Sequence, residues 1–87
     1  EIQTSLEQWQ TANGEVQAFN QIILPAAQGA VDSATRGFEM GKFGFLDVLD
    51  AQRTLISARS QYIQAVSEAT DARVRIERIF GDLAVSP

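Results

Sequence analysis

Apolar and polar residues alternate with helical spacing in two long segments of the chain, and a glycine-rich stretch separates the two. Between residues 48 and 79, apolar side chains or tyrosine recur at alternating steps of three and four residues. This repeat averages 3.5 residues and is typical of helices that pack as a left-handed coiled coil. Five of the ten positions are alanine, so the partner helix can approach closely. These seam positions are Val48, Ala51, Leu55, Ala58, Tyr62, Ala65, Ala69, Ala72, Ile76 and Ile79.

The first segment predicts a helix over about residues 4–40. Two overlapping capping boxes, which begin at Thr4 and Ser5, predict its start. Pro25 removes one backbone hydrogen bond and disfavours helical geometry at Leu24, so a kink and a break are both open, and we favour the kink. The predicted apolar stripe is Ile2, Leu6, Trp9, Ala12, Val16, Phe19 and Ile23, followed after the proline by Ala26, Ala30, Ala34 and Phe38, with Ala27 and Val31 alongside.

The glycine-rich stretch predicts a turn at about residues 41–44. Gly37, Gly41 and Gly44 fall within eight residues, and glycine tolerates the positive φ that tight turns require. A short connection folds two long helices back antiparallel. Gly44 suits the N-cap of a second helix over about residues 45–80, and Gly81 suits the position just after its end. The predicted fold is all-α, a single antiparallel two-helix coiled-coil hairpin over residues 1–87.

A second apolar stripe in the later segment bears on assembly. Leu49, Ile56 and Ile63 repeat every seven residues, offset by one from the seam. They either widen the apolar face of one helix or contact a second neighbour, as in a bundle or a closed ring of helices. Two helices alone cannot enclose a core, so we expect self-association or a larger parent protein.

Composition excludes several classes of function. The net charge is −4 without a basic cluster, which argues against nucleic acid as a partner. No apolar run approaches the roughly 18–20 residues that span a bilayer, and residues 1–10 do not resemble a secretory signal. The chain has no His or Cys, so the usual metal ligands and most nucleophile–base pairs are missing. We expect no enzyme activity, no cofactor and no resident metal.

Two groups of residues near the turn are candidate functional residues. Asp47 and Asp50 are three residues apart at the start of the second helix, where the helix dipole favours negative charge. If several copies surround an axis, the same pair forms a ring of carboxylates, which can select cations. Phe38, Phe43 and Phe45 either pack against one another at the tip or form an exposed docking surface.

These features together resemble a known family. Residues 24–27, 37–55, 58–62 and 76–81, and above all the sequence Asp-Val-Leu-Asp-Ala-Gln at 47–52, resemble the C-terminal repeat of TolC-like outer-membrane efflux proteins. The resemblance is greatest to the heavy-metal branch, the CzcC-type cobalt-zinc-cadmium exporters. That family's fold is a trimeric β-barrel continued by a long α-helical tunnel that reaches into the periplasm. The resemblance implies that this chain is one hairpin of the tunnel.

The resemblance also implies partners and a location. The expected partners are two further copies in a homotrimer, a periplasmic adaptor protein that docks at the tip, and an inner-membrane RND transporter. The chain would be periplasmic in a Gram-negative envelope, with membrane contact only through the barrel outside this segment. The implied entrance and tip residues are Phe38, Gly41, Lys42, Phe43, Gly44, Asp47 and Asp50.

One departure from the family pattern affects the entrance. Drug-efflux members carry Tyr where Phe38 stands and Arg where Phe43 stands, and these polar residues lock the closed entrance. The resemblance therefore implies an apolar closure here. Two other functions stay open from the residues alone, a helical-hairpin oligomerisation module and the hairpin of a periplasmic adaptor (membrane fusion) protein.

Overall fold

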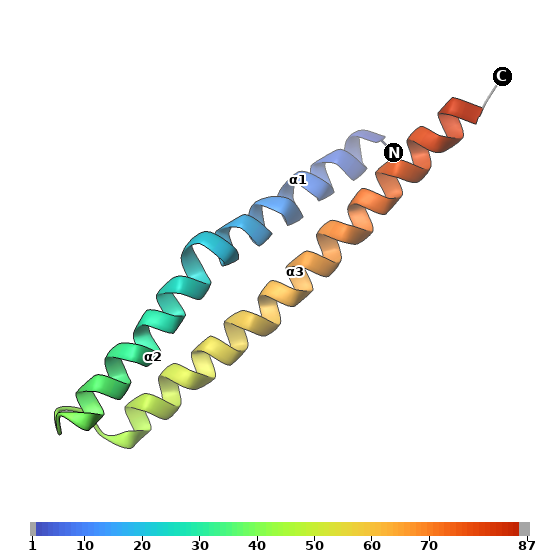
Figure 1. Cartoon of the computed structure of the whole chain (residues 1–87). Coiled ribbons are helices and arrows are strands. Elements are labelled where there is room, and N and C mark those ends of the chain that lie inside the picture. Colours follow the sequence, from blue (N-terminus) through green and yellow to red (C-terminus); the bar gives the residue numbers. More distant parts are fainter. Residues whose placement is uncertain (1, 86–87) are drawn as a thin grey trace.

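The chain folds into a hairpin of two long helical arms (Figure 1). The computed structural model describes residues 2–85. The first arm consists of α1 (Ile2–Ala18), the π-helical turn η1 (Phe19–Ile23) and α2 (Leu24–Glu39), and the second arm is the single helix α3 (Phe45–Val85). α3 runs antiparallel beside both halves of the first arm, in a rod with extents of 72 × 15 × 15 Å. The predicted all-α hairpin is confirmed.

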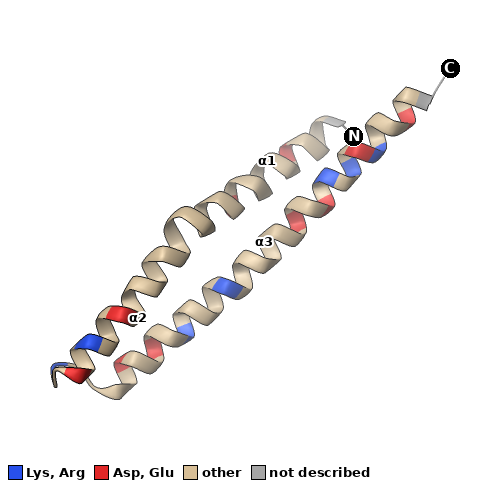
Figure 2. Cartoon of the chain, in the orientation of Figure 1, with Lys and Arg blue, Asp and Glu red and all other residues tan. Residues whose placement is uncertain are grey.

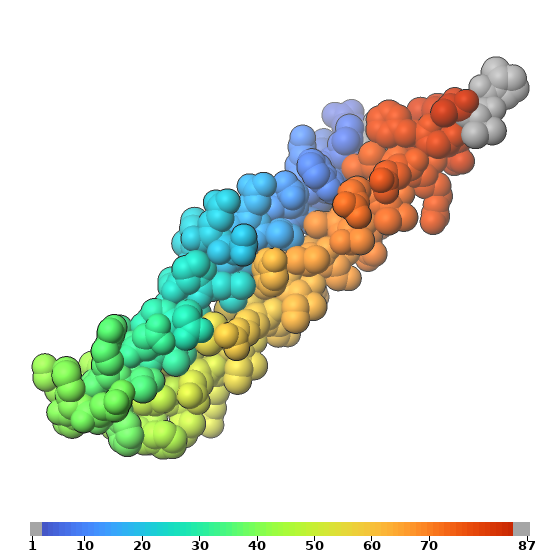
Figure 3. Space-filling model, viewed as in Figure 1, coloured from blue at the N-terminus to red at the C-terminus, as the bar shows by residue number. Residues whose placement is uncertain are grey.

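One face of α3 lies against the first arm from Val48 to Ile79. The ten seam positions from Val48 to Ile79 are all buried or half-buried, and Leu49 is the other residue in that span with reduced exposure. Ala72 is 1% exposed and Ala65 is 3% exposed. The small side chains let the two arms touch along most of the rod, and the C-terminal end of α3 extends beyond the first arm (Figure 3).

The first arm follows the predicted stripe up to Phe19, with one exception. Trp9, Ala12, Val16 and Phe19 are buried or half-buried. Leu6, which was predicted on this face, is 37% exposed, and Ser5 is buried in its place. Positions 5, 9, 12, 16 and 19 continue the alternation of fours and threes, so the side chain at position 5 meets α3 although it is polar. The side chain of Ile2 lies outside the described residues.

Beyond Phe19 the predicted stripe is wrong by one residue. Ile23, Ala26, Ala30 and Phe38 are exposed, although the pattern placed them on the buried face. The interface is formed instead by the neighbouring set, in which Ala27 packs with two seam residues of α3. The apolar side chains of α2 that are buried or half-buried on this face are Leu24, Ala27, Val31 and Ala34, of which only Ala34 had been placed in the stripe itself.

The π-helical turn η1 causes this displacement. The N–H of Leu24 donates to the carbonyl oxygen of Phe19, five residues earlier, so the turn holds one residue more than an α-helical turn. The interface therefore steps by five residues, from Phe19 to Leu24. Dihedral angles at Ile23 (φ −71°, ψ −49°) and Leu24 (φ −65°, ψ −45°) stay helical, so the arm continues through Pro25 without a break.

Pro25 explains why the π-turn lies at this place. In a regular α-helix, the proline ring crowds the carbonyl four residues earlier, which is that of Gln21, and the ring supplies no N–H to bond it. Gln21 lies inside η1, and Pro25 follows in the first turn of α2. Widening the turn moves this carbonyl away from the ring. The wider turn then contains one residue more than an α-helical turn.

Two helix ends differ from the predicted ones. α1 already begins at Ile2, so Thr4 and Ser5 lie within the helix and do not cap it. α3 continues through Gly81 to Val85. Among the described residues, Gly41 is the glycine with positive φ, so Gly81 keeps a helical backbone and does not terminate α3. Glycine lowers helix stability by about 1 kcal/mol, which is insufficient to end a long helix.

Replacing Ala65 with Leu should force the arms apart. Overpacking a tight interface costs about 1–3 kcal/mol, whereas Ser67→Leu, at an exposed position of the same turn, should be nearly neutral. Urea denaturation followed by circular dichroism measures both variants. Equal changes in the free energy of unfolding at the two sites would contradict the register of α3.

Candidate functional site

The tip of the hairpin begins with a Schellman motif that ends α2. The N–H of Lys42 donates to the carbonyl oxygen of Gly37 at 2.7 Å, and the N–H of Gly41 donates to that of Phe38 at 3.0 Å. These two bonds define the motif, which needs a left-handed residue just past the helix. Gly41 supplies that residue, with φ of 73°. The turn therefore occupies the predicted residues, and Gly41 reverses the chain.

Gly37 has a second role at the tip that the sequence pattern did not indicate. The ring of Phe43 folds back over Gly37, and a Cβ atom built there would overlap the ring. The N–H of Phe43 also donates to the carbonyl oxygen of Gly37 at 3.1 Å. The absence of a side chain at position 37 thus creates the space in which Phe43 lies. A third glycine so close to the turn was the only sequence signal for this contact.

The tip exposes a cluster of large apolar side chains. The rings of Phe38 and Phe45 meet at 5.5 Å between centroids with planes tilted by 55°. Both rings remain about half exposed, and Leu46 is 74% exposed. The aromatic rings at this end therefore pack against each other and also remain exposed to solvent. We name this surface the apolar tip, and it consists of Phe38, Met40, Phe43, Phe45 and Leu46.

The two aspartates beyond the tip have different surroundings. The N–H of Gly44 donates to the Asp47 carboxylate at 3.1 Å, so Asp47 caps the start of α3 while Gly44 occupies the N-cap position, as predicted. Asp50 lies 3.9 Å from the guanidinium of Arg53, and both side chains are about three-quarters exposed. Exposed pairs of this kind contribute about 0–1 kcal/mol. Asp50 and Lys42 are exposed to solvent.

Charged residues are unevenly distributed along the rod. Residues 16–31 of the first arm carry none, whereas the facing part of α3 carries Lys or Arg positions (Figure 2). Two hydrogen bonds between arginine and glutamine side chains join the arms. Arg75 donates to Gln8 at 3.1 Å, and Arg59 donates to Gln28 at 3.5 Å. The middle of the hairpin is thus held by apolar packing and by the hydrogen bond from the Arg59 guanidinium to Gln28.

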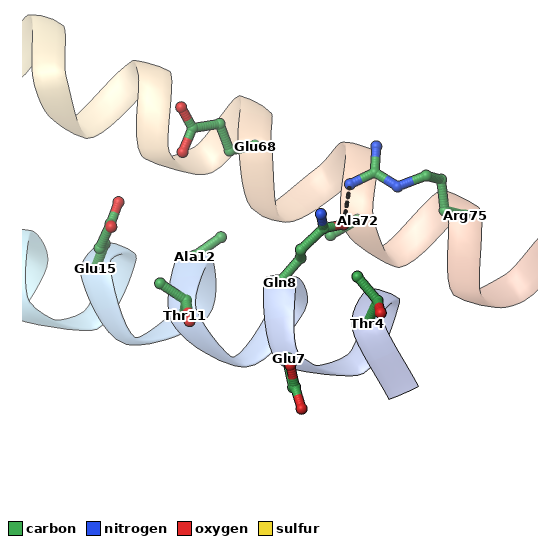
Figure 4. A pocket seen from close by; sticks show the side chains of 9 residues that line it. All are labelled: Thr4, Glu7, Gln8, Thr11, Ala12, Glu15, Glu68, Ala72 and Arg75. Carbon is green, nitrogen blue, oxygen red and sulfur yellow. Dashed lines mark hydrogen bonds between the residues drawn. The ribbon is translucent and has the colours of Figure 1, made fainter. Parts of the chain in front are cut away.

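A groove of about 410 Å³ lies between α1 and α3 (Figure 4). The Glu15 and Glu68 side chains lie on its two sides, Gln8 and Arg75 bridge it, and Glu7 points away from α3. Among residues 2–85, no group of three carboxylates lies close enough to hold a metal ion. The arrangement fits a polar contact between helices and offers no paired acid and base.

The side of α3 carries the second apolar stripe. Leu49 is half-buried, while Ile56 is 63% exposed and Ile63 is 67% exposed. The hairpin therefore leaves this stripe uncovered for most of its length. None of the helices described is both long enough and apolar enough to cross a membrane.

Comparison with known proteins identifies the family. Residues 1–82 match the model of the outer membrane efflux protein family. The chain belongs to this family. It is also 45% identical over 74 residues to the cobalt-zinc-cadmium resistance protein CzcC of Cupriavidus metallidurans. The match covers 85% of this chain and 18% of that relative, so the chain spans about a fifth of the relative's length. No solved structure matches the chain.

Gly41→Ala should destabilise the hairpin, because a left-handed backbone costs a residue with a side chain about 1–2 kcal/mol. Gly14→Ala is the matched control, since Gly14 lies inside α1 with open space around it. That change should stabilise the fold by about 0.5–1 kcal/mol. Thermal unfolding of both variants provides the comparison. Stabilisation by both alanines would rule out the left-handed turn at Gly41.

Proposed function

We propose that this hairpin is a wall segment of the periplasmic α-helical tunnel of a trimeric outer-membrane channel. The channel would export heavy-metal cations as the outer component of a tripartite RND-type pump. The observation that carries the proposal is the 45% identity to a cobalt-zinc-cadmium resistance protein over 85% of this chain. Family membership favours a channel over an adaptor hairpin or a free oligomerisation module.

The flanks of the hairpin support a place in a wall. Arg59 follows Ile56 by three residues and precedes Ile63 by four, so these three side chains share one side of α3. Arg59 bonds Gln28 across the interface. The stripe of half-buried Leu49 and exposed Ile56 and Ile63 therefore lies on the same flank of the hairpin as Gln28 of α2.

The opposite flank has the complementary shape. Ala26 and Ala30 are each two residues from Gln28, which is about 200° around an α-helix, so they lie on the other flank. Both are exposed and small. A hairpin with protruding isoleucines along one flank of α3 and small alanines next to Ile23 on the other flank can pack head-to-tail against a neighbour on each side. Repeated contacts of this kind close into a ring when the rotation between neighbours permits, as the tunnel requires.

The tip is the end through which the channel would meet its adaptor. The apolar tip exposes five large side chains at the end of a narrow rod, an arrangement that marks a protein contact more often than free surface. Phe38 and Phe43 replace the polar residues of drug-efflux members, so closure of the entrance would depend on apolar contact.

Asp47 and Asp50 are proposed to line the entrance. Both lie in the first two turns of α3, next to the tip, and three copies would place six carboxylates around one axis. Such a ring attracts cations. The cap that Asp47 forms with Gly44 leaves a competing role, in which the residue only stabilises the helix start.

Deleting the gene should test metal export directly. Cells without the protein should lose tolerance to Co²⁺, Zn²⁺ and Cd²⁺ and retain more radioactive zinc after loading, and the intact gene should restore both. Unchanged metal tolerance and zinc retention, in cells that lack related channels, would contradict heavy-metal export.

Replacing both Asp47 and Asp50 with Asn separates the entrance role from the capping role. In reconstituted full-length channel, the ring should lose cation selectivity and bind blocking multivalent cations more weakly. Asp71→Asn, an exposed position farther along α3, is the control and should change neither property. If conductance and block stay the same while the melting temperature falls, the two aspartates act only at the helix start.

A further inference from the structure

The first arm carries two apolar stripes one residue apart, and only one of them is buried. Leu24, Ala27, Val31 and Ala34 face α3, whereas Ile23, Ala26 and Ala30 are exposed. The second set has the same spacing of three and four residues and consists of similar side chains. Either set is apolar enough to lie against the alanine seam of α3, so composition alone does not select the register.

The π-turn selects between the two sets. With η1 in place, the interface steps from Phe19 to Leu24 and buries the first set. If η1 became a regular α-helical turn, the interface would step by four residues to Ile23 and bury the second set. The difference is one residue, which corresponds to a rotation of α2 of about 100° about its axis.

We propose that η1 and Pro25 form a register switch in the first arm, with two settings that bury either Leu24, Ala27 and Val31 or Ile23, Ala26 and Ala30. Pro25 holds the first setting, because its ring conflicts with the Gln21 carbonyl in a regular helix and is accommodated by the wider turn. Val31 favours the same setting, because it buries more apolar area than Ala30 would.

The switch acts on the tip. α2 carries Phe38 and the whole Schellman turn, so rotating α2 moves the Phe38 ring relative to Phe45. A change of one residue in the middle of the arm would thus alter the contact surface at its end. π-turns of this kind occur frequently at functional sites in helices.

Cysteine cross-linking in the full-length protein tests the two settings. One variant pairs Ala27→Cys with Ala58→Cys, whose parent residues share a buried cluster, and the matched variant pairs Ala26→Cys with Ala58→Cys. A short bifunctional thiol reagent should link the first pair at least tenfold faster. In the Pro25→Ala background, the ratio should fall at least threefold as the second setting becomes populated. Equal linking of the two pairs without the proline change, or a ratio that Pro25→Ala leaves unaltered, would overturn the proposal.

A pair of deletions keeps the test decisive if Pro25→Ala alone does not assemble. Deleting Gln21 in the Pro25→Ala background removes the extra residue of η1 and the ring that conflicts with a regular turn, so the Ala27–Ala58 link and a second link between Ala12→Cys and Ala72→Cys should both persist. Deleting Gln61 is the matched control, because it removes the same residue type from α3, which contains no π-turn among its described residues. One of the two links should then be lost. Loss of a link after deletion of Gln21 as well would show that η1 holds no spare residue.

Discussion

Close packing of alanines between two antiparallel arms is the interaction on which the rest of the hairpin depends. Six of the eight buried apolar residues are alanine, and among the described residues no large side chain is fully buried. An alanine removes little apolar area from water, so each contact contributes little free energy. Stability must therefore come from many such contacts held in one register, and from whatever covers the exposed flanks. A register error anywhere along the rod would lose several contacts at once.

This dependence on register explains which predictions from the sequence succeeded. In α3, one uninterrupted 3.5-residue repeat runs from Val48 to Ile79, and the helix backbone is regular throughout, so periodicity identified the side chains that face the first arm. In the first arm, the same reasoning placed Ala26 and Ala30 inside, where the structure has Ala27 and Val31. Pro25 was recognised as a disturbance. Periodicity could not show that the helix would accommodate it by adding a residue to one turn, because both neighbouring stripes are apolar.

The tip was predictable because its chemistry is local. Gly41 with positive φ and Gly44 at the start of α3 are consequences of backbone geometry within a few residues. The fit of Phe43 over Gly37 was not predictable, since it depends on the path of the turn in space. The helix ends at Thr4 and Gly81 were misjudged for a related reason. Capping residues permit a helix to stop, but they do not require it to stop when the residues on both sides also favour a helix.

We propose that the hairpin is a wall segment, in which neighbouring helices cover the flanks that the hairpin alone leaves exposed. The most direct test of this proposal is the rate at which a thiol reagent modifies Ile56→Cys in the full-length protein, since the Ile56 side chain is 63% exposed in the hairpin alone. If neighbouring helices cover this flank, modification should be at least tenfold slower in the assembled channel than in the same protein dissociated in denaturant. Equal rates in the two states would show that the flank faces solvent and that the hairpin is not a wall segment.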